Sequence, residues 1–319
     1  MTTFLWIELA AAGIMLALIW LAFQHRERAE VDSLRDKAPG RFVRLSDGVT
    51  HVLDLGPRDG EVVLLVPGAT LGLWVWHDLP LTLSNAGYRV IAFDLYGRGL
   101  SDRPYTTYNA DLFDRQIVDL LQELRVPQPV SLVGLAFGCP ISANFVLRHP
   151  DAVKRVCFFG PDGFGVVMTG MAKLVQRRLI GDFLFRLIGN KALIARLPGY
   201  STNKKVLTWL EANYTPDLDL KGFKRALLSS IRNMPIHDAR DLYARVDQTG
   251  KPFMFIWGRE DHVTPIPPRF DPAAIFPRAN MHLLPRVGHL PHVDAPEATN
   301  ERLLAFLRDD KAPVAFAAK

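Results

Sequence analysis

The sequence has few cysteines and no strong excess of charge. Cys139 and Cys157 are the two cysteines among 319 residues, too few for a disulfide framework, and both lie in apolar runs where a small buried thiol is expected. The formal net charge is +5 and the pI about 9.2, but no basic stretch with interleaved aromatic residues is present, so we expect no nucleic-acid partner. The sequence also lacks a metal-ligand cluster, a nucleotide-binding loop and a redox motif, so we expect no cofactor and no bound metal.

The composition is that of a folded chain with a large core. Hydrophobic residues make up 49% of the sequence and charged residues 22%, and 319 residues are enough for one large α/β domain or two ordinary ones. No internal repeat or low-complexity segment is evident, and nothing in the sequence indicates an oligomeric state.

The N-terminal segment is strongly apolar. The run from Phe4 to Phe23 contains one charged residue, Glu8, and as a helix it would be roughly 30 Å long, the thickness of a hydrocarbon core. It predicts a transmembrane anchor at residues 1–24 and a single-pass membrane location. The alternatives are a cleaved signal peptide, which would need basic residues before the run and a cleavage site after it, and a buried core helix.

Basic and acidic residues follow the apolar run. Arg26 and Arg28 come directly after it, and by the positive-inside rule they place the folded domain on the cytoplasmic side. Residues 25–40 have the composition of a charged juxtamembrane linker, and Pro39-Gly40 marks the start of the globular part.

Beyond residue 40, short apolar runs alternate with helical patterns. Residues 41–56 have the alternation of a hairpin, and six further runs are short, rich in β-branched or aromatic residues, and have Gly, Pro or Asp at or near their ends: 61–68, 88–95, 129–136, 153–160, 251–258 and 280–288. Continuous apolar strands separated by helices predict an α/β fold with a mostly parallel central sheet and helices on both faces. Ligands then bind at the carboxyl ends of the strands.

About ninety residues interrupt this alternation. Residues 161–250 show several helical patterns in place of a strand and crossover, so we expect an inserted helical cap there. The core domain then consists of residues 41–160 and 251–319.

A strand-to-helix turn lies at Gly134-Leu135-Ala136-Phe137-Gly138. Its glycines flank one central residue two positions away on each side. Such a turn is sharp and strained, which allows only small flanking residues, and it lifts the central side chain to the top of the sheet. The pattern is G-x-S-x-G with alanine at the nucleophile position, 136.

At this point the chain resembles the α/β-hydrolase superfamily, from about residue 42 to 310. The segments that carry the resemblance stand in the family's order: PGAT at 67–70, FDLYGRGLSDRP at 93–104, the elbow at 134–138, WGREDHVTP at 257–265 and VGHLPHVDAPE at 287–297. Pro67 stands where the family usually has His. The architecture resembles membrane-anchored monoacylglycerol lipases and related carboxylesterases.

The resemblance implies a role for each site residue. The order nucleophile, acid, base maps onto Ala136, Asp261 and His289, with Asp162 as the alternative acid. The backbone N–H groups of Ala69 and Phe137 would form the oxyanion hole.

Alanine at position 136 has three interpretations. The one we favour is a serine carboxylic-ester hydrolase whose nucleophile has been replaced, as in an engineered inactive variant, because the acid, the base and both glycines are present. The second is a natural pseudohydrolase that binds a ligand or partner. The third is a cofactor-free His-Asp dyad enzyme, a dioxygenase or lyase. An aspartate nucleophile, as in haloalkane dehalogenases and epoxide hydrolases, is a less favoured restoration than serine.

The expected substrate is a lipid-like or other hydrophobic ester. Residues 171–200 of the cap combine apolar and basic residues in an amphipathic pattern. The pattern is typical either of a cap helix packed on the core or of an entrance for an acyl chain. Trp74 and the side chain of Phe137 are candidate substrate contacts, although the tryptophan can equally serve packing.

Overall fold

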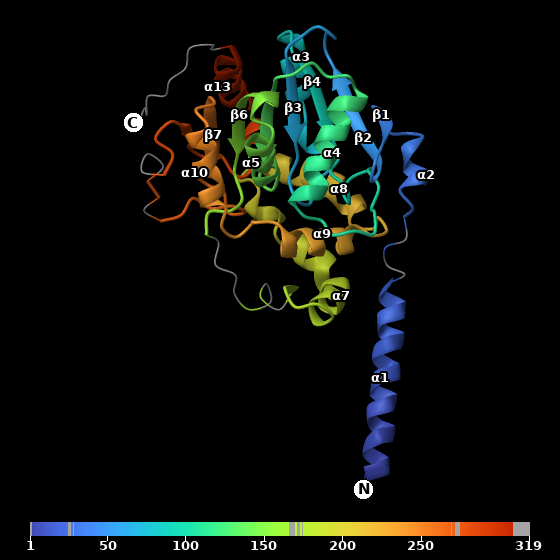
Figure 1. Ribbon diagram of the computed structural model, residues 1–319. Helices are drawn as coiled ribbons and strands as arrows, with labels where there is room; N and C mark the ends of the chain where they lie inside the picture. Colours follow the sequence, from blue (N-terminus) through green and yellow to red (C-terminus); the bar gives the residue numbers. More distant parts are fainter. Residues whose placement is uncertain are drawn as a thin grey trace.

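A mixed β-sheet forms the centre of the molecule (Figure 1). The computed structural model describes residues 2–24, 27, 29–165, 170, 173, 175–268, 270–271 and 275–308. Within these ranges the sheet has eight strands in the order β1-β2-β4-β3-β5-β6-β7-β8. β1 pairs with β2, and β2 with β4, in antiparallel fashion; all other neighbours are parallel.

The strands fall where the apolar runs predict them. All residues of β3, β4, β5 and β7 are buried, because the sheet is covered on both faces and each strand contributes alternate side chains to two separate cores. The predicted hairpin and the six predicted strands are confirmed: β1 (Arg41–Leu45), β2 (Gly48–Leu55), β3 (Val62–Val66), β4 (Arg89–Phe93), β5 (Val130–Leu135), β6 (Val153–Phe159), β7 (Phe253–Gly258) and β8 (Asn280–Leu284).

Helices cover the two faces of the sheet. One layer packs around α5 and the other around α3 and α13, so the predicted α/β architecture with helices on both faces is confirmed. The first layer consists of α4 (Ala110–Glu123), α5 (Gly138–Arg148) and α10 (Arg240–Gln248). The second consists of α3 (Leu79–Asn85), α12 (Pro291–Asp294) and α13 (Pro296–Arg308). Short 3-10 turns are η1 (Leu73–Trp76), η2 (Pro150–Ala152) and η3 (Leu197–Gly199).

Further helices lie between β6 and β7, below the sheet in Figure 1: α7 (Ile180–Ile194), α8 (Lys204–Asp217) and α9 (Phe223–Asn233). They lie in the region expected to form the cap. α10, in the same stretch of sequence, packs on α5 and joins the layer on the sheet. The division into a core and a cap at residues 161–250 stays a prediction.

The N-terminal apolar run forms α1 (Thr2–Gln24), which extends away from the sheet in Figure 1 and contacts α7. Trp20 stacks on Phe183 of α7 with 5.9 Å between ring centroids. The prediction of a membrane-spanning anchor and a single-pass membrane location is wrong: across the residues that the structure describes, no helix is both long and apolar enough to cross a bilayer. A span needs about 20 consecutive, predominantly apolar residues, and the charged Glu8 interrupts the apolar sequence of α1.

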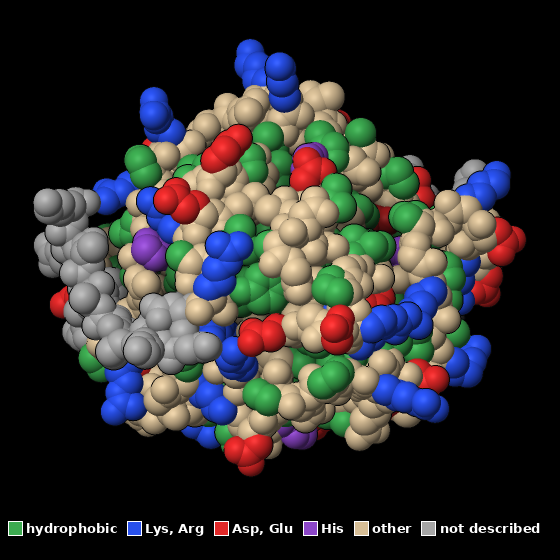
Figure 2. Space-filling view, turned by 90° about the horizontal axis from the view of Figure 1, so that it is seen from above, with side chains coloured by type: hydrophobic (Ala, Val, Ile, Leu, Met, Phe, Trp, Pro, Cys, Tyr) green, Lys and Arg blue, Asp and Glu red, His purple; other side chains and the backbone are tan. Residues whose placement is uncertain are grey.

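The orientation expected from Arg26 and Arg28 rests on residues that lie outside the described ranges. The face of the molecule away from α1 and α7 is seen in Figure 2. Basic, acidic and hydrophobic side chains are intermixed over its visible part, without a large area of one sign.

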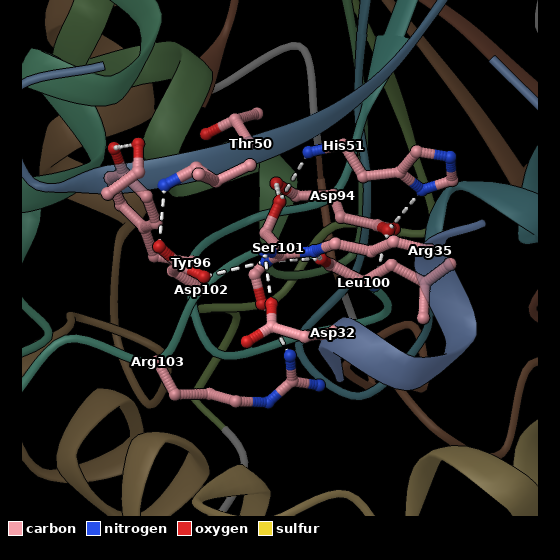
Figure 3. Close-up of polar contacts among 12 residues, drawn as sticks. Asp32, Arg35, Thr50, His51, Asp94, Tyr96, Leu100, Ser101, Asp102 and Arg103 are labelled. Carbon is pink, nitrogen blue, oxygen red and sulfur yellow. Dashed lines mark hydrogen bonds and ion pairs between the residues drawn. The ribbon is translucent and has the colours of Figure 1, made fainter. Parts of the chain in front are cut away.

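The linker before the sheet is attached through α2 (Asp32–Arg35) (Figure 3). Arg35 donates to Oδ1 of Asp102 at 2.6 Å and to the carbonyl of Leu100. Nδ1 of His51 lies 2.8 Å from Oδ2 of Asp94, and the N–H of His51 donates to Ser101. These contacts fix the segment 94–103, which continues from β4 to the rim of the site described next.

Candidate active site

The turn between β5 and α5 has the geometry that its motif predicts. Ala136 has φ +49°, in the left-handed region that costs an L-residue roughly 1–2 kcal/mol. A Cβ atom on Gly138 would come within 2.0 Å of the carbonyl oxygen of Val66, and one on Gly134 within 2.9 Å of the Gly138 backbone. Only glycine fits at these two positions. The close backbone packing on both sides of the turn holds Ala136 in its strained conformation.

Asp261 and His289 form a buried acid–base pair. Both side chains are at most 2% exposed, and Nδ1 of His289 lies 2.8 Å from Oδ2 of Asp261. The other carboxylate oxygen, Oδ1, accepts the N–H groups of Val263 at 2.9 Å and Thr264 at 2.8 Å. Because an ionised carboxylate accepts the Nδ1 proton, Nε2 is left as the nitrogen that can take a proton from a reacting group.

Thr264 contacts both residues of the acid–base pair, and the sequence did not reveal this role. Its hydroxyl lies 2.9 Å from Oδ2 of Asp261, 3.2 Å from Nδ1 of His289 and 2.9 Å from the carbonyl oxygen of Gly160. The side chain is buried. The sequence signal was slight: a hydroxyl residue three positions after the acid.

Ala136 and His289 line one cavity of about 480 Å³, which we call the active-site cavity. Residues 68–71, which follow β3, and Leu135, at the end of β5, line it on the side of the sheet. The helices below the sheet contribute mostly apolar side chains: Leu184, Phe185, Ile188, Leu193, Leu227 and Ile231. The carbonyl oxygen of Tyr200, just after η3, accepts the backbone N–H of His289 at 2.7 Å, and the Tyr200 and His289 rings form a T-shaped pair with 5.0 Å between centroids. The region below the sheet therefore holds the base in place and closes the cavity.

The two predicted oxyanion donors lie beside the elbow. Ala69 lines the cavity, and a Cβ atom on its neighbour Gly68 would lie 3.8 Å from Cβ of Ala136. The N–H groups of Ala69 and Phe137 donate no hydrogen bond to any residue that the structure describes. They are thus available to an oxygen placed above Ala136.

Arg98 anchors the loop that carries Ala69, a contact that the sequence did not reveal. The buried guanidinium donates from Nε to the carbonyl of Ala69 at 2.7 Å and from Nη2 to Oγ of Ser230 at 2.8 Å. Burial lowers its pKa to about 10, so the group stays charged at neutral pH. It ties the loop that contains Ala69 to α9.

The predicted substrate contacts of Trp74 and Phe137 do not gather around the cavity, and neither residue is among those that line it. The Trp74 indole donates to Oδ2 of Asp217 at 3.0 Å and packs edge-on against Trp209. The Phe137 ring is fully buried against Phe113. The structure gives both side chains packing contacts.

Asp162, the alternative acid, lies apart from the pair but in the same cavity. Its N–H donates to the carbonyl of Ala136 at 3.3 Å, and burial raises the pKa of its carboxyl to about 6, with His289 and Arg196 acting against the shift. Asp261 holds the position of the orienting acid, because it is the carboxylate bonded to Nδ1.

Cys139 does not replace the missing hydroxyl. Its thiol is fully buried in α5 and donates to the carbonyl of Gly134 at 3.2 Å, and burial raises its pKa well above the usual value. Over the described ranges, no group of three or more His, Cys, Asp or Glu side chains could hold a metal ion.

Comparison with known proteins places this geometry in a family. The family described as alpha/beta hydrolase fold matches residues 61–296. A 2-hydroxy-6-oxononadienedioate/2-hydroxy-6-oxononatrienedioate hydrolase of Burkholderia vietnamiensis is 28% identical over 286 residues, covering 86% of this chain and 97% of the relative. A 2-hydroxy-6-oxo-6-phenylhexa-2,4-dienoate hydrolase of Burkholderia cepacia is 26% identical over 292 residues, covering 86% and 98%.

Solved structures agree on the fold. An enol-lactonase from Burkholderia xenovorans LB400 superposes with a TM-score of 0.71 at 19% identity, over 84% of this chain and 100% of the other. A thermophilic esterase from Thermogutta terrifontis gives 0.70 at 20% identity, over 84% and 98%. The finer resemblance to membrane-anchored monoacylglycerol lipases is not supported, since these relatives carry other names.

Proposed function

The chain belongs to the alpha/beta hydrolase fold family, and on that premise we propose that positions 136, 261 and 289 form a serine-type hydrolase site that lacks its nucleophilic oxygen. One observation carries the proposal. A strained elbow whose side chain is a methyl group shares one cavity with an imidazole that a buried carboxylate orients, and beside it lie two backbone N–H groups that donate to no described residue.

With a hydroxyl at position 136, each remaining part has a task. Nε2 of His289 takes the hydroxyl proton as the oxygen attacks a carbonyl carbon, and the N–H groups of Ala69 and Phe137 bind the resulting oxyanion. The imidazolium, stabilised by Asp261, then returns the proton to the leaving group. A water molecule repeats the sequence on the acyl enzyme and frees the acid.

With the methyl group of Ala136 the covalent step cannot begin. In a serine protease, removal of the nucleophile costs roughly a millionfold in turnover, about 8 kcal/mol of barrier. The chain as written should therefore be nearly inactive as an esterase, although it keeps the cavity and the means to bind a carbonyl compound.

The substrate we propose is a hydrophobic carboxylic ester, including a lipid-like ester. Apolar side chains of α7 and α9 supply much of the cavity wall, and a volume of about 480 Å³ lies in the range of cavities that enclose small organic ligands. Polar and ionisable residues are the minority of the lining: Thr70, Asp162, Arg196, Tyr200, His237 and His289.

A second candidate is hydrolysis of a carbon–carbon bond in a 2-hydroxy-6-oxo acid. The two curated relatives are named for such substrates. The observation in its favour is Arg196, which lines the cavity and could pair with a substrate carboxylate. The same oxyanion hole and base would serve this reaction.

The test compares wild type with Ala136→Ser and with the double variant Ala136→Ser/His289→Ala. We expect Ala136→Ser to gain turnover of p-nitrophenyl esters or of a 2-hydroxy-6-oxo dienoate, and the double variant to lose it again. The preferred substrate class decides between the two candidates. If folded Ala136→Ser turns over neither class, the site is not a hydrolase site but that of a binding protein.

The dyad alternative makes the opposite prediction. A cofactor-free oxygenase or lyase would already be active with Ala136 and would depend on His289. Oxygen uptake by the wild-type chain with a heteroaromatic substrate, abolished by His289→Ala, would establish it in place of the hydrolase.

A further inference from the structure

A buried arginine contacts both residues of the proposed oxyanion hole. Arg98 lies in the segment 94–103 that follows β4, and its side chain is fully buried. Its Nε donates to the carbonyl of Ala69 at 2.7 Å, and its guanidinium carbon lies 5.7 Å from the centroid of the Phe137 ring. Arg98 is not among the residues that line the active-site cavity, so it contacts these two residues from outside the cavity wall.

The groups that accept hydrogen bonds from Arg98 are electrically neutral. Besides the carbonyl of Ala69, they are the carbonyl of Tyr96 at 3.2 Å and Oγ of Ser230 at 2.8 Å. The guanidinium also lies 5.9 Å from the centroid of the Tyr108 ring. Among the residues that the structure describes, no carboxylate forms an ion pair with Arg98. These contacts hold the guanidinium in one place without compensating its charge.

A buried cation with only neutral partners is costly, because burial removes the water that would otherwise solvate its charge. In the same surroundings its electric field is weakly screened, so it acts on charges beyond its direct contacts. An oxyanion bound by the N–H groups of Ala69 and Phe137 would place a negative charge next to the two residues that Arg98 contacts. The charge of Arg98 therefore has the sign and the place to stabilise that oxyanion.

We propose that Arg98 is a positioning residue of the oxyanion hole, which holds the loop that contains Ala69 and favours a negatively charged oxygen in the hole over a neutral one. The inference rests on the proposed hydrolase function. A charge that is in place before the reaction needs no reorganisation when the oxyanion forms, so it lowers the barrier to chemistry more than it strengthens substrate binding. Ser230, which accepts from the same guanidinium, links this device to α9.

Kinetics of the full chain with Ala136→Ser, the parent variant, test the proposal. In this parent, Arg98→Gln removes the charge but keeps an amide that can donate, whereas Arg98→Lys keeps the charge. On a p-nitrophenyl ester we expect Arg98→Gln to lower kcat by about tenfold or more and to change KM by less than about twofold. Arg98→Lys should recover most of the lost kcat.

Two inhibitors separate an effect of charge from a loss of structure. With an alkyl trifluoromethyl ketone, the serine oxygen bonds to the carbonyl carbon, its proton passes to Nε2 of His289, and the carbonyl oxygen becomes an oxyanion in the hole. The corresponding secondary alcohol forms no such bond and stays neutral. We expect Arg98→Gln to weaken the ketone by about tenfold or more and the alcohol by less than about twofold, because only the ketone presents a negative charge.

Arg103→Gln in the same parent is the matched control. Arg103 belongs to the same segment, and its hydrogen bonds to described residues go to the carbonyls of Ser101 and of Gly99, the latter at 2.6 Å. Its substitution removes one positive charge as well, but it should leave kcat and the affinity for the ketone within about twofold of the parent.

Two results with Arg98→Gln would overturn the inference: kcat and ketone affinity equal to those of the parent, or equal weakening of the ketone and the alcohol. If Arg98→Gln does not fold, Arg98→Lys decides, because weak ketone binding despite the retained charge would also overturn the inference. An inactive Ala136→Ser parent, in which Arg98 is intact, would contradict the hydrolase function itself, so the two failures are distinguishable.

Discussion

Nδ1 of His289 lies 2.8 Å from Oδ2 of Asp261, and the carboxylate is fixed in turn by two backbone N–H groups at its other oxygen. The contact commits one ring nitrogen to the acid, and the function we propose uses the other nitrogen at position 136. His289 of this firmly held acid–base pair lines the same cavity as the methyl group of Ala136.

Thr264 should act as a positioning residue. In the Ala136→Ser background, Thr264→Val removes the hydroxyl that lies within hydrogen-bond reach of both Asp261 and His289. Loss of one hydrogen bond to a charged group, about 1.5 kcal/mol, lowers kcat by about tenfold. KM should stay nearly constant, because Thr264 does not line the cavity, and Thr264→Ser should restore kcat. Steady-state kinetics on an ester measure this; a change confined to KM would contradict the role.

The buried carboxyl of Asp162 should make the free energy of unfolding depend on pH. Its pKa is raised from 3.8 to about 6, so the folded state binds the proton more tightly than the unfolded state does. Stability is therefore lost as pH rises through about 4 to 6, and the cost is complete above that range. Asp162→Asn removes the cost, which is on the order of 1–3 kcal/mol.

Urea unfolding of the wild type and Asp162→Asn at pH 4 and pH 7.5 checks this expectation. The variant should gain stability over the wild type at the higher pH and much less at the lower one. An equal difference at both pH values would show that the carboxyl titrates alike in the two states.

Glycine at position 136 should relieve the backbone strain of the elbow. Ala136 has φ +49°, which glycine adopts without a Cβ penalty, so Ala136→Gly should raise the free energy of unfolding by about 0.5–1 kcal/mol. The control is Ala143→Gly inside α5, where the same change should cost about 1 kcal/mol. Chemical denaturation measures both, and a loss of stability in Ala136→Gly comparable to the control would refute the strain.

Gly138 should tolerate no side chain. In Gly138→Ala the new Cβ would meet the carbonyl oxygens of Val66 at 2.0 Å and Pro67 at 2.8 Å, both part of the backbone. We expect a loss of more than about 2 kcal/mol, because strand β3 must shift to admit the methyl group. Gly13→Ala in α1, where nothing lies within 4 Å of the new atom, should cause no loss. Thermal unfolding compares the two; similar midpoints would contradict the close approach.

The strands and the elbow were predictable because their signals are local. A parallel strand buried on both faces has a continuous apolar sequence, as β3 and β5 show. The elbow requires two glycines at fixed spacing, since Gly138 packs directly on β3. The pairing of Asp261 with His289 was implied by the resemblance to the α/β-hydrolase superfamily, whose order of site residues these two positions match.

Other features depend on contacts that the sequence does not encode locally. Thr264 and Arg98 act through groups distant in the chain, such as Gly160 and Ala69. Trp74 was expected to face the substrate, but its indole finds a partner on α8. In the N-terminal segment, hydropathy predicted the helix correctly and its membrane location wrongly.

The central claim is that position 136 faces a functional base and oxyanion hole. Its most direct test is the intact mass of the Ala136→Ser variant after exposure to a fluorophosphonate, which reacts only with an activated hydroxyl. The account predicts one covalent adduct, located at position 136 by peptide mapping, and none in the wild type or in Ala136→Ser/His289→Ala. A folded Ala136→Ser variant that stays unmodified, or an adduct that survives loss of the imidazole, would contradict it.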